Sequence, residues 1–383
     1  MLENTLDQEL TDYLDSIYVR SHSMRTYASY RMAVTNKHKN GFREFLQERH
    51  NCNEIQFVFR VKNEEFDLFK ILREYVVYLD KQTYMPKSIE QRVTAIKGYL
   101  RHLGLKIYSE DFKHGVTLPK IKITREEPLT KDIIQRVLAN ISAKLQVVVL
   151  ILSASGMRIG ELAELKISDI DFTLKPTRIM IRAETTKTSE ARETFITEEA
   201  TRALKDYLYR YFHWEENERN LHMQSLQIFG RTSVSKSGKV RDESELKNPS
   251  SYTASNLLMK SLANSIRNIP DLDSKNASNG RRMVHYHALR KYFRTIVGNV
   301  SGRDYAEALM GRRFYLDTYY NMPAEDRRKK YLDVEPYLTI SDTKTVEKNY
   351  SKLSEKHEQL EEKMNDLIKY LRTNSIQVPH SLK

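Results

Sequence analysis

Apolar residues recur at helical spacing through the first 117 residues of the chain. In the segment EFDLFKILREYVVYLDKQ they fall three and four positions apart, which predicts an amphipathic helix. A second helix is predicted after Pro86, and Gly104 fits a cap at its C-terminal end. We therefore expect residues 1–117 to form a helical domain.

The pattern changes after residue 117. Residues 118–130 carry two prolines, mixed charge and no helical period, which predicts an interdomain linker. Thr130 fits the N-cap of the next helix. From 131 to 340, helical segments alternate with TRIMIRAETTKTSEARETFIT, whose two arms flank a polar turn and predict a β-hairpin. The expected fold is mainly α with a small antiparallel sheet (α+β).

Residues 341–383 form a separate, heptad-patterned helical tail. Its apolar positions lie four and then three residues apart, with charged residues between them. The seam is formed by Val346, Tyr350, Leu353, His357, Leu360, Met364, Leu367 and Leu371. Two interpretations fit this spacing: a coiled coil between copies of the chain, which we favour, and a helix packed on its own domain.

Composition narrows the function classes. The 383 residues carry a net charge of +12, and such a surplus attracts polyanions, nucleic acid first among them. A solubilising surface is the alternative. No apolar run reaches the ~20 residues that a membrane span needs. Cys52 is the one cysteine, which excludes an internal disulfide and a cysteine-based zinc site. The acidic N-terminus lacks the basic-then-apolar pattern of a secretory leader. We therefore expect a reducing, intracellular setting.

Two short motifs in the first half of the α+β region could contact a phosphate. In SASGMRIGELAEL, Arg158 opens a predicted helix beside free backbone N–H groups, a position suited to an anion. Lys187 stands in the hairpin turn, where a flexible ammonium group can deliver a proton to a leaving oxygen. Taken singly, each also fits an ordinary surface residue.

Two further motifs follow. In HYHALRKYF, His287 and Arg290 stand three residues apart and share a helix face, so the imidazole could manage protons while the guanidinium grips a phosphate. In ALMGRRFYLDTYYNMP, a glycine and Arg312 precede Tyr315, Tyr319 and Tyr320. Each tyrosine fits a packing residue or a nucleophile.

Together and in this order, the motifs resemble those of the tyrosine recombinase (phage integrase) family, over about residues 125–340. The ending MPAEDRRKKYLDVEPYLTI is similar to that of archaeal and archaeal-virus members. The resemblance implies that Arg158 and Arg290 bind the scissile phosphate, that Lys187 is the general acid, and that His287 assists proton transfer. Glu161 matches an acidic position that supports the first arginine. The resemblance also implies a core-binding domain in residues 1–117 and a catalytic domain in 131–340.

The fourth motif departs from the family pattern. Arg312 stands where the family usually has His or Trp, and arginine cannot accept a proton. The family's tyrosine usually lies nine residues further on, which is Asn321 here. Tyr320 is one position short and Tyr319 two. We favour Tyr320 as the nucleophile, then Tyr319, then Tyr315.

The resemblance implies a site-specific recombinase, an integrase of a mobile element, that cuts and rejoins double-stranded DNA through a 3′-phosphotyrosyl link. It implies no metal, ATP or other cofactor, no membrane or small-molecule partner, and a homo-tetramer on paired sites. Such a protein acts in the cytoplasm at the nucleoid, or in the host cytoplasm if it is viral. The alternatives are a type IB topoisomerase or telomere resolvase, and a non-catalytic DNA-binding regulator.

Overall fold

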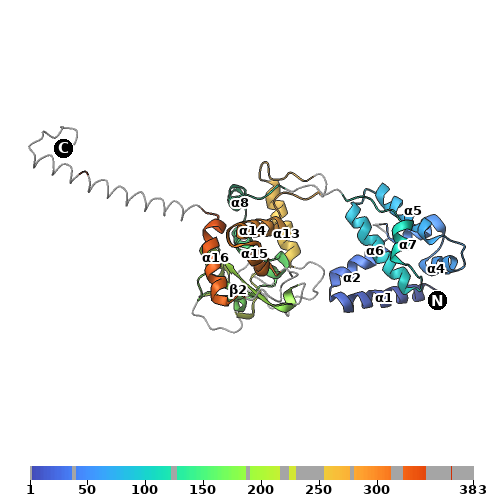
Figure 1. The fold of residues 1–383 in the computed structure, drawn as a ribbon, viewed down its shortest axis with the longest axis horizontal. Coiled ribbons are helices and arrows are strands. Elements are labelled where there is room, and N and C mark those ends of the chain that lie inside the picture. The colour runs from blue at the N-terminus through green and yellow to red at the C-terminus, as the bar shows by residue number, and fades with distance from the viewer. Residues whose placement is uncertain are drawn as a thin grey trace, which may run out of the picture. The chain divides into compact units, whose positions relative to one another are not determined.

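The structure is a computed structural model that describes residues 2–36, 40–121, 127–186, 190–215, 224–229, 254–276, 280–311, 322–341 and 364. The chain divides into two compact units, residues 1–125 (unit 1) and 126–383 (unit 2). In Figure 1, unit 1 is coloured blue to cyan and unit 2 green to red. Within these described stretches, no helix is both long enough and apolar enough to cross a membrane.

Unit 1 contains helices and, among its described residues, no strand. Helix α5 begins after Asp67, whose carboxylate accepts hydrogen bonds from the first N–H groups. Helix α6 begins at Pro86, and Gly104 follows its end with a φ of +88°. Both sequence-predicted helices are therefore confirmed. The helices are α1 Leu2–Ser21, α2 Met24–Val34, α3 Phe42–His50, α4 Glu54–Lys62, α5 Leu68–Lys81, α6 Pro86–His102 and α7 Ser109–Gly115.

Unit 1 has an apolar core of its own. The ring of Phe42, which is fully buried, meets those of Phe45, Phe57 and Tyr75 at centroid distances of 6.2, 5.8 and 5.2 Å. Aromatic rings bury large apolar areas and favour such offset-stacked and edge-to-face contacts. A neighbouring cluster around Tyr13 joins α1 to α2 and α6. The helices of unit 1 therefore form a core of their own.

Unit 2 is built around helix α9, which is apolar on every side. All residues from Val147 to Ser155 are buried, and α8, α11, α13, α14 and α16 pack against the helix. A helix that is hydrophobic all round belongs in the centre of a domain. The helices of unit 2 are α8 Lys131–Leu138, α9 Ala143–Ser155, α10 Ile159–Ala163, α11 Glu198–Phe212, α13 Ala254–Arg267, α14 Tyr286–Ser301, α15 Arg303–Met310 and α16 Ala324–Leu338, with short 3-10 turns at Ile167–Asp169 and Ala183–Thr185.

A three-stranded antiparallel sheet completes unit 2. The strands β1 Ile170–Asp171, β2 Thr177–Ile181 and β3 Arg192–Ile196 lie in the order β1-β2-β3. Ile179 pairs with Thr194, and residues of β2 alternate between buried and less buried positions. The hairpin and the mainly α fold with a small sheet are confirmed, whereas β1 was not predicted. Apart from Met364, the tail after residue 341 lies outside the described residues.

Candidate active site

The turn between α9 and α10 is the centre of the candidate site. Gly156 ends α9 with a φ of +63°, in the left-handed region that favours glycine. A Cβ at this position would lie 2.3 Å from the ring of Phe293 in α14. Both the backbone conformation and the close approach of α14 therefore require glycine. Arg158 follows two residues later and precedes α10.

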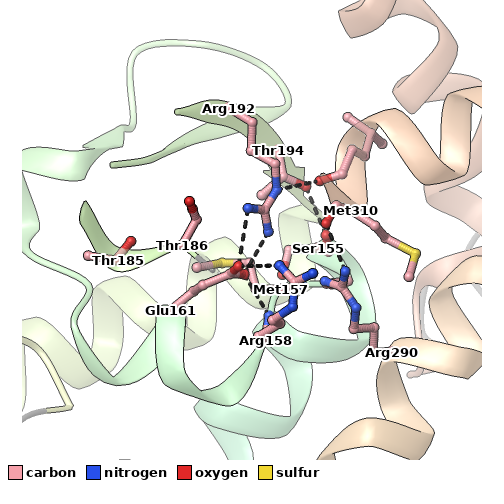
Figure 2. Close-up of polar contacts among 12 residues, drawn as sticks. Ser155, Met157, Arg158, Glu161, Thr185, Thr186, Arg192, Thr194, Arg290 and Met310 are labelled. Carbon is pink, nitrogen blue, oxygen red and sulfur yellow. Dashed lines mark hydrogen bonds and ion pairs between the residues drawn. The ribbon is translucent and has the colours of Figure 1, made fainter. Parts of the chain in front are cut away.

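Glu161 holds two arginines at this turn. Its Oε1 accepts from Nη1 of Arg158 at 2.7 Å, and its Oε2 accepts from the backbone N–H of Arg158 at 2.8 Å. Arg192, at the start of β3, donates to the same two oxygens at 3.2 and 2.6 Å. Figure 2 shows the carboxylate between the two side chains. Glu161 therefore occupies the backbone N–H of Arg158 itself, and the sequence-predicted phosphate site beside the first N–H groups of the helix stays a prediction.

The charge of Glu161 is compensated although the residue is buried. Burial alone would raise the pKa of this carboxyl, but the hydrogen bonds and charge of Arg192, and then those of Arg158, lower it below its ordinary value. The carboxylate is thus ionised between two cations, and the three residues together keep a positive charge. Arg158 remains partly exposed, with 29% of its side chain accessible.

Arg290 reaches the same turn from α14. Its Nη1 donates to the carbonyl of Gly156, and its Nη2 donates to the carbonyl of Met310 at 2.7 Å. Arg158 is two positions after Gly156, with only Met157 between them, so Nη1 of Arg290 lies within about 9 Å of the Arg158 Cα. The structure therefore brings together the two arginines that stand 132 positions apart in the sequence, and Figure 2 shows both at the turn.

The C-terminal end of α15 is attached to this cluster. Arg192 Nε donates to the carbonyl of Leu309 at 3.1 Å, next to the Met310 carbonyl that Arg290 holds. The last carbonyls of a helix lack partners within it and interact favourably with cations. Gly311 ends the helix with a φ of +62°. The two arginines thus fix the point at which the chain enters the tyrosine-containing stretch.

His287 stands on α14, one turn before Arg290. Its side chain is exposed, and its pKa is lowered by partial desolvation, then by the positive charge of Lys291, His285 and Arg290. The imidazole is therefore neutral at neutral pH and able to accept a proton. The expected shared helix of His287 and Arg290 is confirmed, because both lie in Tyr286–Ser301.

The remaining candidates lie outside the described residues: Lys187, Arg312, Tyr315, Tyr319 and Tyr320. The described residues next to these candidates are held by hydrogen bonds. Glu190 donates through its N–H to the hydroxyl of Thr186 across the hairpin turn at 3.1 Å. After residues 312–321, the helix α16 is held to the core by Tyr331, whose hydroxyl donates to the Ala154 carbonyl at 2.6 Å.

Sequence reasoning missed Arg192. It lies in the quoted hairpin, at a position that a strand pattern assigns to a half-buried side chain, and no local signal identifies a partner 31 residues upstream. The one signal that the sequence offers is an arginine at the start of a predicted strand, and this signal is weak. Among the described residues, no group of three or more His, Cys, Asp or Glu side chains is placed to hold a metal ion.

The segment that carries this geometry matches a known family. Residues 127–304, which include the α9–α10 turn, the hairpin and Arg290, match the family described as "Phage integrase family". The match covers somewhat less than half of the chain. The match ends at residue 304, so it includes neither the end of α15 nor the tyrosines.

Two relatives with known names illustrate the similarity. The chain is 30% identical over 102 residues to "Tyrosine recombinase XerA" of Pyrococcus horikoshii, which covers 26% of this chain and 34% of that protein. It is 32% identical over 111 residues to "Tyrosine recombinase XerD" of Rickettsia bellii, covering 26% and 35%. The matched part therefore spans about a third of the length of these relatives.

Solved structures of similar proteins include two recombinases. A lambda integrase tetramer bound to a Holliday junction is 12% identical, with a TM-score of 0.49, over 83% of this chain and 79% of that one. A crystal structure of XerA recombinase is 19% identical, with a TM-score of 0.36, over 85% and 97%.

Proposed function

We propose that the chain is a site-specific tyrosine recombinase that breaks and rejoins double-stranded DNA. What supports this is the meeting of Arg158 and Arg290 at one turn, within a segment that matches the phage integrase family. Each guanidinium offers a fork of N–H donors suited to the non-bridging oxygens of a phosphodiester, and the two arginines lie at the same turn. Arg158 uses only Nη1 of its side chain in its contacts with described residues, so Nε and Nη2 can bind a phosphate oxygen.

The proposed reaction is a transesterification. The phenol oxygen of Tyr320, or of Tyr319, attacks phosphorus, its proton passes to a base, and the bond from phosphorus to the 5′-oxygen breaks. A phenol has a pKa near 10, so it needs cationic surroundings and a proton acceptor. Neutral His287 suits the acceptor role. Lys187 protonates the leaving 5′-oxygen.

Charge develops on the phosphorane as the tyrosine attacks. Arg158 and Arg290, held at one turn before reaction, would stabilise that charge with little reorganisation. Arg312 adds a third cation near the tyrosines. The step exchanges one phosphoester for another, so the 5′-hydroxyl of another strand can reverse it without an energy source.

We also propose how the whole protein acts. Unit 1 serves as the core-binding domain, residues 131–340 as the catalytic domain, and the tail as a self-association element within a tetramer on paired sites. The net charge of +12 supports a DNA partner. Acting on chromosomal or viral DNA, the protein works in the cytoplasm.

Covalent capture tests this function. The protein is incubated with nicked duplexes from a fragment library, denatured with detergent, and the attached DNA is sequenced. We expect one sequence to be enriched as a 3′-linked adduct. Tyr319→Phe and Tyr320→Phe, made separately, identify the nucleophile, and we expect Tyr320→Phe to abolish the adduct.

The alternatives predict different results. Adducts on any supercoiled plasmid, with relaxation, indicate a type IB topoisomerase. Tight binding to one sequence without any adduct indicates a DNA-binding regulator, for which Arg312 and the short tyrosine spacing are the motivation. Either result would contradict the recombinase proposal.

A further inference from the structure

Arg192 connects two elements that the sequence separates by more than a hundred residues. Its Nη1 and Nη2 donate to the carboxylate of Glu161 in α10, and its Nε donates to the carbonyl of Leu309 at the end of α15. All three nitrogens of one guanidinium therefore bind protein groups. The side chain is 10% exposed.

We propose that Arg192 is a positioning residue for strand cleavage. Through Glu161 it fixes Arg158, and through Leu309 it fixes the end of α15, from which the chain continues to the tyrosines. It thereby sets the distance between the phosphate-binding arginine and the start of the nucleophile's segment. The inference rests on the proposed recombinase function and deepens it.

The charges at Glu161 give a first reason for this role. With Arg192 present, two cations share one carboxylate, and Arg158 keeps a positive charge to offer to a phosphate. Without Arg192, Glu161 would retain Arg158 alone, and the buried pair would be neutral. Arg158 would then be drawn toward Glu161 and out of alignment with the charge that develops during cleavage, because a buried carboxylate binds its last cation strongly.

The packing at Gly311 gives a second, independent reason. A Cβ at Gly311 would lie 2.6 Å from Cδ of Arg192. The chain therefore leaves α15 in direct contact with the Arg192 side chain, and it turns there with a positive φ. A displacement of about 1 Å at this point is enough to slow an in-line attack by about 100-fold.

A small cation from solution could reach the space that the Arg192 guanidinium occupies. It lines a hollow of about 330 Å³ together with Glu193, Leu309 and Arg327. Truncation of Arg192 to alanine would open the space of the lost guanidinium toward this hollow. Methylguanidinium in solution could then occupy that space and contact Glu161 and the Leu309 carbonyl.

Arg182 offers a matched control. Like Arg192, it joins a carboxylate to a backbone carbonyl: its Nε lies 3.1 Å from Asp169, and its Nη2 donates to the Glu164 carbonyl at 2.7 Å. It contacts neither Glu161 nor α15 in the described structure. Arg182→Ala therefore removes the same kinds of contact without the proposed positioning effect.

The experiment compares Arg192→Ala, Arg192→Lys and Arg182→Ala in the full chain on the captured target duplex. We expect Arg192→Ala to slow single-turnover cleavage by about 100-fold, while the Kd for DNA changes by less than about threefold. Arg192→Lys should remain slow, because an ammonium cannot make the three contacts. Methylguanidinium should restore cleavage to Arg192→Ala and leave Arg182→Ala unchanged.

Hydrogen exchange supplies a measurement that does not depend on activity. Amides in a peptide covering residues 303–311 should exchange about tenfold faster in Arg192→Ala than in Arg182→Ala, because the end of α15 is released. Unchanged exchange overturns the proposal, as does cleavage at the wild-type rate. If the wild-type protein forms no adduct at all, the recombinase function fails, and the positioning role of Arg192 in cleavage fails with it. The exchange result still decides whether Arg192 anchors α15.

Discussion

Glu161 is the residue on which the charge balance of the site depends. Its carboxylate is buried, and it accepts from both Arg158 and Arg192. An isolated buried carboxylate would become protonated, but two guanidinium partners lower its pKa instead. The interaction therefore stabilises the ionised form, and its contribution to folding depends on pH in a defined direction.

We expect Glu161→Gln to lower the free energy of unfolding of unit 2 by about 2–4 kcal/mol at pH 7, because the new amide group faces guanidinium donors. Since the folded-state pKa of Glu161 is lowered, the stabilisation is complete above the unfolded value of about 4.3 and is lost as pH falls below it. Urea titrations should show that Glu161→Gln lowers the free energy of unfolding by the same amount at pH 7 and pH 5, and by a smaller amount at pH 3.5. Glu184→Gln, at a pair with a 69% exposed carboxylate, should change stability by less than about 0.5 kcal/mol.

His287 gives a prediction for the pH dependence of cleavage. Its lowered pKa means that the neutral base is present at pH 7 and is lost as pH falls through a value below about 6.5. Single-turnover rates on the target duplex should therefore decline only on the acid side of that value. His287→Gln should lower the rate by about 100-fold or more and remove this acid decline.

Lys291 provides the control for this prediction. Its positive charge is one cause of the lowered pKa of His287. Lys291→Gln should raise that pKa, so the acid decline should move to higher pH while the rate at pH 8 stays close to that of the wild type. A decline at the same pH in both proteins would contradict the assignment of His287 as the titrating base.

At this scale, the sequence could predict some of the site. Arg158, Arg290 and His287 were identified because each stands in a motif whose order resembles a family. Arg192 was not, because its role depends on Glu161 and Leu309, and contact between these residues is created only when β3 and α15 pack together. Side chains that act by joining distant elements carry no local signal.

At the scale of elements, the junction of α9 and α14 determines where the arginines meet. Gly156 lets α9 end in a left-handed turn and lets Phe293 pack against that turn. The same close approach brings Arg290 to the Gly156 carbonyl. The position of Arg290 relative to Arg158 therefore depends on a residue without a side chain.

Gly156→Ala tests this dependence, with Gly160→Ala as the matched control. We expect Gly156→Ala to destabilise unit 2 by about 2–5 kcal/mol, because a left-handed alanine is strained and its methyl group overlaps the Phe293 ring. Gly160 lies in α10, and a methyl group added there would meet no described atom within 4 Å. Gly160→Ala should therefore be neutral or stabilise by up to about 1 kcal/mol. Thermal and urea unfolding measure both; equal effects would contradict the packing argument.

Elements with a strong local pattern could be predicted from the sequence. The alternation in TRIMI predicted β2, and the apolar period with its proline and glycine ends predicted α6. The two-residue strand β1 was missed because pairing with β2, rather than its own sequence, creates it. Arg158 precedes a helix, as the sequence predicted, but α10 has only five residues, and its length was not predicted from the sequence.

For the whole molecule, the two units have separate cores and share the positive charge. Residues 1–125 carry 21 Lys and Arg against 16 Asp and Glu, a net charge of +5, and residues 126–383 carry the remaining +7. Neither unit alone accounts for the surplus. If both units bind DNA, each unit should make phosphate contacts of its own.

The salt dependence of DNA binding tests whether both units contact phosphates. On the captured target duplex, log Kd against log salt should have a steep slope for the full chain, near 0.9 for each phosphate contact, because binding releases counterions. Residues 1–125 and 126–383, expressed separately, should fold because each has its own core, and they should bind with shallower slopes that add up to about the slope of the full chain. Circular dichroism confirms that each fragment is folded before titration. A slope of zero for a folded unit 1, with the full slope kept by unit 2, would show that DNA binding belongs to unit 2 alone, and it would exclude unit 1 as a core-binding domain.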